Sequence, residues 1–214
     1  MLNRVFRRNL HKMFQKFDPS QTASFEEKLI LVNTNDQVVG SVAKIDAHLK
    51  IMQNKYPHRA FSVFLFNQKN ELLLQQRSDK KITFPGLWSN TCCSHPLYNE
   101  KEINEVENMG IKLAAVRRMK EELGLNTEIE NYLLLDKMLY RAESGHMFEE
   151  FELDYILLSK FDFNIHEIKK NLNKNEVSDV RLIEQNELIQ EVKSNKLRVT
   201  PWLNMILEKG GVPI

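Results

Sequence analysis

GIKLAAVRRMKEEL, residues 110–123, places apolar side chains at positions 111, 114, 115, 119 and 123. This spacing of three to four residues is typical of a helix that buries one face. The next residue is Gly124, and glycine often ends a helix because it adopts the left-handed conformation without strain. We therefore predict an amphipathic helix over residues 110–123.

Strand-like segments lie on both sides of this helix. The predicted strands are residues 28–33, 37–44, 59–66, 71–77, 132–140, 149–159 and 180–183, the first four forming two hairpins. The runs at 59–66 and 71–77 are apolar without alternation, which indicates strands buried on both faces. We expect further helices over 184–194 and 201–209, the latter with Thr200 as N-cap and Pro201 in the first turn. Elements in this order predict an α+β domain with helices on a mixed sheet.

Composition sets the class of protein. The 214 residues fit one domain, residues 25–214, preceded by an extension over residues 1–24. With 30 basic and 29 acidic residues the chain is not a general nucleic-acid binder. The two cysteines are adjacent, which indicates a reducing compartment rather than a disulfide framework. No apolar run approaches the roughly 18 residues of a membrane span, so we expect no stable membrane insertion.

The extension is basic and amphipathic over residues 1–17 and resembles a linker over residues 18–24. An organelle-targeting presequence, a surface helix and an oligomer contact are the three interpretations of residues 1–17. Cytoplasm is the default expectation, with organelle import through residues 1–17 as the alternative. We expect a monomer or a weak dimer.

One uncharged loop contains several residues that could take part in catalysis or metal binding. Residues 83–96 read TFPGLWSNTCCSHP, and Pro85-Gly86 breaks regular structure there. The loop presents Cys93, Ser94 and His95. The alternative interpretation is a turn that packs two apolar thiols, because free cysteine is often buried.

Two further sets of residues could form a site. His48, His58 and His95 lie near predicted strand ends or in loops, and Glu150 and Glu152 point to one face of a strand because they are two residues apart. Three imidazoles and two carboxylates could hold a divalent ion, unless they are unrelated core and surface residues.

The second set is basic: Lys44, Arg77, Lys81 and Arg118. Such cations could clamp a phosphate or diphosphate, although each alone could equally be a solvated charge.

The chain resembles the type 1 isopentenyl-diphosphate Δ-isomerases over residues 28–207. The matching segments are Lys44 with His48, 58–62, 74–77 with Lys81, 90–96, 117–124, 140–142, 150–152 and 200–202. That family is similar in fold to the Nudix hydrolases, which implies a Nudix-like mixed β-sheet core, flanked by helices, over about residues 56–208. Residues 117–125, RRMKEELGL, resemble the second half of the Nudix box.

The box is broken at two positions. Arg118 replaces its first glutamate in this half, and Met109 stands where the upstream half expects glutamate. A hydrolase of that class needs these acids to gather metal and activate water. The departures therefore argue against a Nudix-type diphosphate hydrolase, which is the alternative function; a non-catalytic domain with a structural metal is a third.

The resemblance implies a metal role for six residues. One divalent ion, Mg²⁺, Mn²⁺ or Zn²⁺, would be held by His48, His58, His95, Glu150 and Glu152. Glu122 would contact a Mg²⁺ that bridges the substrate diphosphate.

The resemblance also implies roles around the substrate, an allylic or homoallylic diphosphate. Its diphosphate would be neutralised by Lys44, Arg77, Lys81 and Arg118, with Ser94 nearby. Cys93 and Glu152 would flank the C5 unit on opposite faces as acid–base groups. Tyr140 would hydrogen-bond a carboxylate, and Trp202 would offer its aromatic face to a cation. Cys92 is interpreted as a packing residue.

Overall fold

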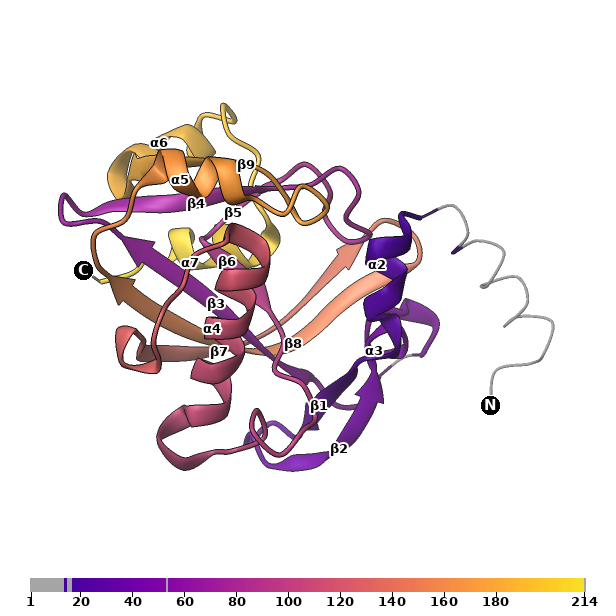
Figure 1. Cartoon of the computed structure of the whole chain (residues 1–214). Coiled ribbons are helices and arrows are strands. Elements are labelled where there is room, and N and C mark those ends of the chain that lie inside the picture. Colours follow the sequence, from indigo (N-terminus) through magenta and orange to yellow (C-terminus); the bar gives the residue numbers. More distant parts are fainter. Residues whose placement is uncertain (1–13, 15–16, 53, 214) are drawn as a thin grey trace.

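The structure is a computed structural model that describes residues 14, 17–52 and 54–213 (Figure 1). It contains one mixed sheet of nine strands. The strands are β1 (Lys28–Val32), β2 (Val38–Ala43), β3 (His58–Phe66), β4 (Glu71–Arg77), β5 (Trp88–Ser89), β6 (Cys92–Ser94), β7 (Leu133–Ser144), β8 (Phe148–Lys160) and β9 (Val177–Glu184). The predicted α+β class is therefore confirmed. Apart from Phe14 and Phe17, the basic segment predicted over residues 1–17 lies outside the described residues.

The second predicted hairpin opens immediately after its turn. β3 and β4 pair only at Phe66 and Leu72. Beyond that point β3 lies between β6, antiparallel to it, and β8, parallel to it, while β4 pairs with β9 and β5. The predicted loop at residues 83–96 thus contains two short strands, one on each arm of the opened hairpin. This places the cysteines next to β3.

Helices cover both faces of the sheet, and the alternation of side chains along β3 explains why its whole length is apolar. Phe61, Val63 and Leu65 pack into the core beneath α4 (Met109–Leu123), whose predicted apolar stripe is buried as expected. Phe64 and Phe66 point the other way, toward α7 (Pro201–Glu208) and α6 (Gln185–Lys193). Burying one such side chain stabilises the fold by about 1.5–3 kcal/mol.

Helix ends differ from the predictions in one case. Gly124 ends α4 in the left-handed region, at φ 65°, and a Cβ there would meet the Cβ of Asn171 at 2.5 Å. Thr200 precedes α7, but its side chain does not cap the helix. Its Oγ1 instead lies 3.1 Å from Ser89 Oγ, inside the protein. A helix not predicted from the sequence, α5 (Ile165–Asn171), packs near Gly124.

The linker predicted over residues 18–24 is wrong. Residues 19–26 form helix α2 (Pro19–Ala23) and the 3-10 turn η1 (Ser24–Glu26). Asp18 caps α2 by accepting a hydrogen bond from Ser20 N at 3.0 Å. Gln21 Nε2 donates to Asn175 O at 3.0 Å, so this segment is fastened to the domain. Among the described helices, none is long and apolar enough to cross a membrane.

Candidate active site

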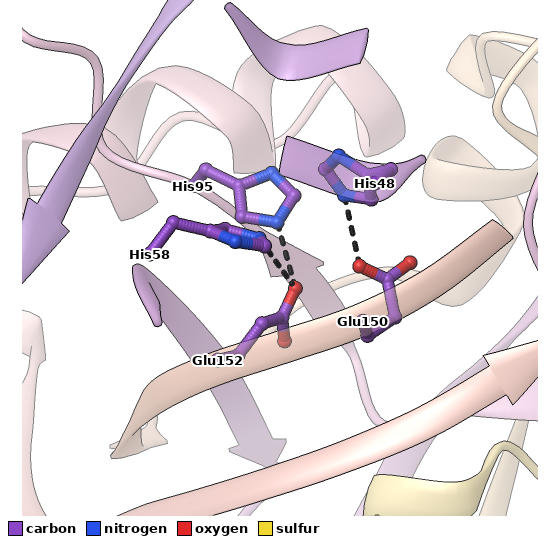
Figure 2. A group of neighbouring side chains, drawn as sticks. All are labelled: His48, His58, His95, Glu150 and Glu152. Atoms are coloured by element: carbon purple, nitrogen blue, oxygen red, sulfur yellow. Dashed lines mark hydrogen bonds and ion pairs between the residues drawn. The ribbon is translucent and has the colours of Figure 1, made fainter. Parts of the chain in front are cut away.

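Three histidines and two glutamates from separate elements meet at one point (Figure 2). His48 ends α3 (Lys44–His48), His58 begins β3, and His95 directly follows β6. Glu150 and Glu152 lie on one face of β8. One ligand atom from each residue lies within 4.8 Å of all the others. The structure thus brings together all five residues predicted to hold one ion.

The donor atoms of this group fit a divalent cation. Because a carbonyl only accepts, His48 Nδ1 donates to Lys44 O, 2.6 Å away, which leaves the Nε2 lone pair facing Glu150 Oε2 at 2.8 Å. His58 Nε2 and Glu150 Oε2 are buried and, within the described part of the chain, neither has a hydrogen bond of good geometry. Buried polar atoms rarely stay unpaired. A cation bound here would satisfy them, and mixed nitrogen and oxygen ligands suit Mg²⁺, Mn²⁺ or Zn²⁺.

Electrostatics favour the same interpretation at His95, whereas at His48 burial is outweighed by the Glu150 carboxylate, which raises the pKa of that imidazole. Burial, together with the neighbouring His58 and His48, lowers the pKa of His95 well below its usual value. A neutral imidazole keeps a lone pair for a metal. His95 Nε2 lies 2.8 Å from Glu152 Oε1, so nitrogen and carboxylate converge on the centre of the group.

The four predicted clamp cations line a single cavity, next to the metal-ligand group. Lys44 is half-buried, and this burial lowers its pKa to about 8, with repulsion from Arg118 and Lys81 adding to the effect. Arg118 donates from Nη2 to Glu122 Oε1 at 2.7 Å. These charges converge where the diphosphate was expected, and Ser94 also lines the cavity.

Arg77 differs from the other three cations. Its guanidinium donates to the carbonyl oxygens of Thr83, at 2.8 Å, and Phe84, at 3.1 Å. It also lies 5.5 Å from the centre of the Trp202 ring. Arg77 therefore holds the loop in place as well as lining the cavity.

Glu122 lies apart from the five metal ligands. It is buried in α4, where Arg118 occupies Oε1 and Gln75 Nε2 lies 3.3 Å from Oε2. Its carboxylate is thus beside the cationic clamp, as expected for a residue predicted to meet the diphosphate rather than the first ion.

The two cysteines occupy opposite faces of β6. Cys92 is fully buried and packs in the core beneath α4, whereas Cys93 lines the cavity. Burial raises the pKa of the Cys93 thiol to about 12, so the thiol is neutral near pH 7. Because it lines the cavity and Cys92 does not, only Cys93 is placed to meet a ligand.

Glu152, Tyr140 and Trp202 line the same cavity as Cys93. The Tyr140 hydroxyl donates to Glu152 Oε2. Trp202 is buried, and its ring centre lies 6.3 Å from that of Tyr140. The indole Nε1 lies 3.1 Å from Cys93 Sγ. The four residues predicted as catalytic thus line one cavity.

Sequence reasoning missed two acids in this cavity region. Asp154 continues the alternation of Glu150 and Glu152 along β8 and accepts a hydrogen bond from Ser62 Oγ at 2.8 Å. Its position two residues after Glu152, on the same face of the strand, could have identified Asp154 from the sequence. Glu176 approaches Lys81 Nζ to 2.5 Å and Arg118 Nη2 to 3.5 Å. No sequence signal pointed to Glu176, because it comes from the turn before β9.

The N-terminal segment helps to form the cavity. About 760 Å³ of space lies among the lining residues when the open solvent at its mouth is included. Gln21, Ser24 and Phe25 of the N-terminal segment contribute to its wall. Its lining combines a group of cations, of which Lys81 and Arg118 meet at Glu176, with a group in which Cys93 and Tyr140 lie beside Trp202.

Comparison with known proteins identifies the family. Residues 56–203 match the model of the NUDIX domain. "Isopentenyl-diphosphate Delta-isomerase 1, chloroplastic" of Cannabis sativa is 42% identical over 194 residues, which cover 86% of this chain and 66% of the relative. "Isopentenyl-diphosphate Delta-isomerase I" of Camptotheca acuminata is 42% identical, with 86% of this chain and 80% of the relative covered. The chain spans less than two thirds of the Cannabis sativa relative, 66%, and of "Isopentenyl-diphosphate Delta-isomerase II" of Camptotheca acuminata, 61%.

Solved structures support the same fold. A Deinococcus radiodurans protein matches 85% of this chain and 98% of its own, with a TM-score of 0.58 and 19% identity. A NUDIX hydrolase from Alicyclobacillus acidocaldarius matches 68% of this chain and 86% of its own, with a TM-score of 0.52 and 8% identity. At such identities the likeness concerns the fold alone. The chain therefore has a NUDIX domain and belongs to the isopentenyl-diphosphate Delta-isomerase family.

Proposed function

We propose that this chain converts isopentenyl diphosphate to dimethylallyl diphosphate. The observation that carries the proposal is that one cavity is lined both by the cations Lys44, Lys81 and Arg118 and by Cys93 with the Tyr140–Glu152 pair. We refer to these two groups as the cationic end and the acid–base end. The first end suits a diphosphate and the second suits proton exchange with a small hydrocarbon. The curated relatives carry the name of this isomerase.

The reaction moves a double bond by adding a proton at one carbon and removing a proton from another. Protonation of an unactivated alkene creates the character of a tertiary cation, which water would capture. Burial of Tyr140, Trp202 and Glu152 keeps this end of the cavity dry. The aromatic face of Trp202 stabilises the developing charge.

Two residues of this chain exchange the protons. Cys93 and Glu152 act on the C5 unit from opposite faces, so that neither the substrate nor the protein needs to rotate between the two transfers. Tyr140 holds the Glu152 carboxylate through its hydroxyl hydrogen bond. A divalent ion in the group of three histidines and two glutamates supplies positive charge that orients Glu152 and adjusts its basicity.

The diphosphate end binds and orients the substrate. Lys44, Lys81 and Arg118 neutralise the phosphates, with Ser94 and Arg77 in the same wall. Glu122 would contact a Mg²⁺ carried by the diphosphate. The metal in the first site is Mg²⁺, Mn²⁺ or Zn²⁺.

A Nudix-type diphosphate hydrolase is the alternative, and the broken box weighs against it. Arg118 occupies a position where the box has an acid, and here it pairs with Glu122 and Glu121. Arg118 thus places a cation where a hydrolase of that class would place one of its metal-gathering acids.

An NMR experiment tests the proposal. Purified protein is incubated with isopentenyl diphosphate and Mg²⁺ in D₂O, and dimethylallyl diphosphate carrying deuterium is the expected product. A phosphate-release assay on nucleoside diphosphates runs in parallel. Release of phosphate without any isomerised product would overturn the proposal in favour of the hydrolase.

Location and assembly stay predictions. Relatives from Cannabis sativa and Arabidopsis thaliana are named chloroplastic. Import of this chain through residues 1–17, as against residence in the cytoplasm, is tested by following a tagged full chain and one that lacks these residues. Sedimentation of the purified chain tests the expected monomer or weak dimer.

A further inference from the structure

Asn90 is a completely buried side chain that contacts the Cys93 thiol. The thiol donates to Asn90 Oδ1, with 2.9 Å between sulfur and oxygen. Asn90 is not among the described residues that line the cavity, although Cys93 is. Asn90 can therefore act on a ligand only through its neighbours.

The orientation of the Asn90 amide is fixed by its other end. Nδ2 donates to the carbonyl of Val63 at 3.0 Å and lies 3.3 Å from the carbonyl of Cys92. Turning the amide over would set its oxygen against two carbonyl oxygens and bury three unpaired acceptors. The hydrogen-bond network therefore assigns Oδ1 to the side that faces Cys93.

The direction of the thiol hydrogen follows from the same contacts. A thiol has one hydrogen, and an amide oxygen is purely an acceptor, so the approach at 2.9 Å requires the sulfur to be the donor. Trp202 Nε1, 3.1 Å from the sulfur, is purely a donor, and Ser89 Oγ lies at 3.3 Å. The hydrogen thus points to Asn90, while the Trp202 N–H faces a sulfur lone pair.

Asn90 also connects this loop to the start of α7. Its Oδ1 lies 3.1 Å from Trp202 Nε1 and 3.2 Å from Ser89 Oγ. Ser89 Oγ in turn lies 3.1 Å from Thr200 Oγ1. These groups hold one another's side chains in single rotamers, and Asn90 contacts Ser89, Cys93 and Trp202 directly.

We propose that Asn90 is a positioning residue that holds the Cys93 thiol in one rotamer with its hydrogen in one direction. A fixed thiol presents the sulfur to the C5 unit at a constant distance, which proton transfer requires. The neutral amide exchanges no proton itself. The kinetic consequence of this inference rests on the proposed isomerase function, whereas the hydrogen bond does not.

Two variants separate positioning from general stability. Asn90→Leu removes both ends of the amide at similar volume. Thr91→Val is the matched control, because Thr91 is equally buried and its hydroxyl bonds Leu73 O at 2.7 Å and Leu65 N at 2.9 Å, away from Cys93. Asn90→Leu is expected to lower kcat by about tenfold or more with KM within about twofold of wild type. Thr91→Val should leave both constants near wild type.

A spectroscopic measurement tests the hydrogen bond directly. In a Cys92→Ala background Cys93 carries the sole thiol of the chain, so its S–H stretching band in the infrared is unambiguous. Asn90→Leu should move this band to higher wavenumber, because the S–H bond strengthens when its acceptor is lost. Thr91→Val should not move it. If Asn90→Leu does not fold, Asn90→Ser, whose shorter side chain draws the acceptor away, takes its place.

Two results would overturn the inference. The first is an S–H band that does not move in the folded Asn90 variant, and the second is an equal loss of kcat in the Asn90 and Thr91 variants. Because the band is recorded without substrate, this failure is distinct from that of the proposed function, in which wild-type protein would form no dimethylallyl diphosphate.

Discussion

The Arg117 guanidinium makes two hydrogen bonds to the Glu102 carboxylate, 2.7 Å from Nε and 2.9 Å from Nη2. The same guanidinium donates to His95 O at 3.2 Å, and Glu102 accepts from Leu97 N at 2.7 Å. The pair therefore fastens the backbone around His95 to helix α4.

Removing the metal should abolish turnover and lower stability. The five converging ligands stabilise the fold when an ion satisfies them, by about 2.7 kcal/mol at a free concentration one hundred times Kd. Chelation should therefore lower the melting temperature, and Mg²⁺ with Mn²⁺ or Zn²⁺ should restore both melting temperature and rate. Full activity in protein shown by elemental analysis to be free of metal would contradict this prediction.

The cysteines should behave differently although they are neighbours. Cys93→Ala removes a group that lines the cavity and should eliminate nearly all turnover while the protein stays folded. Cys92→Ala should mainly lower the melting temperature, because Cys92 packs in the core beneath α4. Steady-state rates and thermal midpoints of the two variants provide the comparison; a reversed pattern would move the catalytic thiol to Cys92.

Arg118→Glu should weaken substrate binding without creating a hydrolase. The change removes one clamp cation and places a new carboxylate next to Glu122 and Glu176, both of which Arg118 now contacts. KM should rise more than kcat falls. Arg118→Gln is the control that removes the cation without adding an acid. Clear diphosphatase activity in Arg118→Glu would place the chain closer to the hydrolases.

Replacing Trp202 should lower the rate more than the stability. Phe has a weaker cation-attracting face and lacks the indole N–H that contacts Cys93. Trp202→Phe should lower turnover about tenfold, equivalent to about 1.4 kcal/mol, and Trp202→Leu should lower it further.

The second tryptophan of the chain provides a control for that experiment. Trp88 packs near α7 outside the described cavity lining, so Trp88→Phe should leave the rate per folded molecule near wild type. Rate and thermal midpoint are measured on all three variants. If the two Trp202 variants keep the wild-type rate per folded molecule while their thermal midpoints fall, Trp202 is not part of the site.

Substrate capture should weaken above about pH 8. Burial, and then Arg118 and Lys81, lower the pKa of Lys44 to about 8, so its charge is present below that pH and is lost as the pH rises through it. The value of kcat/KM should fall over this range, while kcat stays level because bound diphosphate holds the proton on Lys44. Lys44→Met should lower kcat/KM and remove this step.

The contribution of Lys44 to the free energy of unfolding should rise with pH, whereas substrate capture weakens. An unfolded lysine has a pKa near 10.4, so between about pH 8 and 10 the unfolded state binds more protons at Lys44 than the folded state does. The contribution of Lys44 to the free energy of unfolding therefore rises with pH in this window. Denaturant titrations of wild type and Lys44→Met at two pH values measure it; a fall in that contribution would contradict the lowered pKa.

Regular elements were predictable because their signals are local. The stripe of α4 and the apolar run of β3 each follow from side-chain periodicity within one segment. The separation of β3 from β4 was not predictable, because it results from competition among β6, β8 and β9 for the same edges. The helix α2 escaped prediction because its five residues are polar and small, and contacts with Asn175 and Glu176 hold them in place.

The site was predictable where it coincides with a family pattern. Cys93 and the five metal ligands belong to matching segments, and the structure gathers them. Asn90 was singled out only as part of the loop, because nothing in the sequence indicates which way its amide faces. Glu176 and Glu102 act through charges from distant turns, and a pairing of that kind has no spacing rule.

The division of the two cysteines between the faces of β6 also governs how the protein responds to oxidants. Neighbouring Cα atoms are about 3.8 Å apart, below the usual disulfide range, and the alternation of a strand turns the two sulfurs away from each other. The chain has no third cysteine. A sulfenic acid formed on Cys93 would thus meet no thiol of its own chain that could resolve it. Recovery from oxidation would depend on an external thiol small enough to enter the substrate cavity, and a bound diphosphate substrate would protect the enzyme by blocking both the oxidant and that thiol.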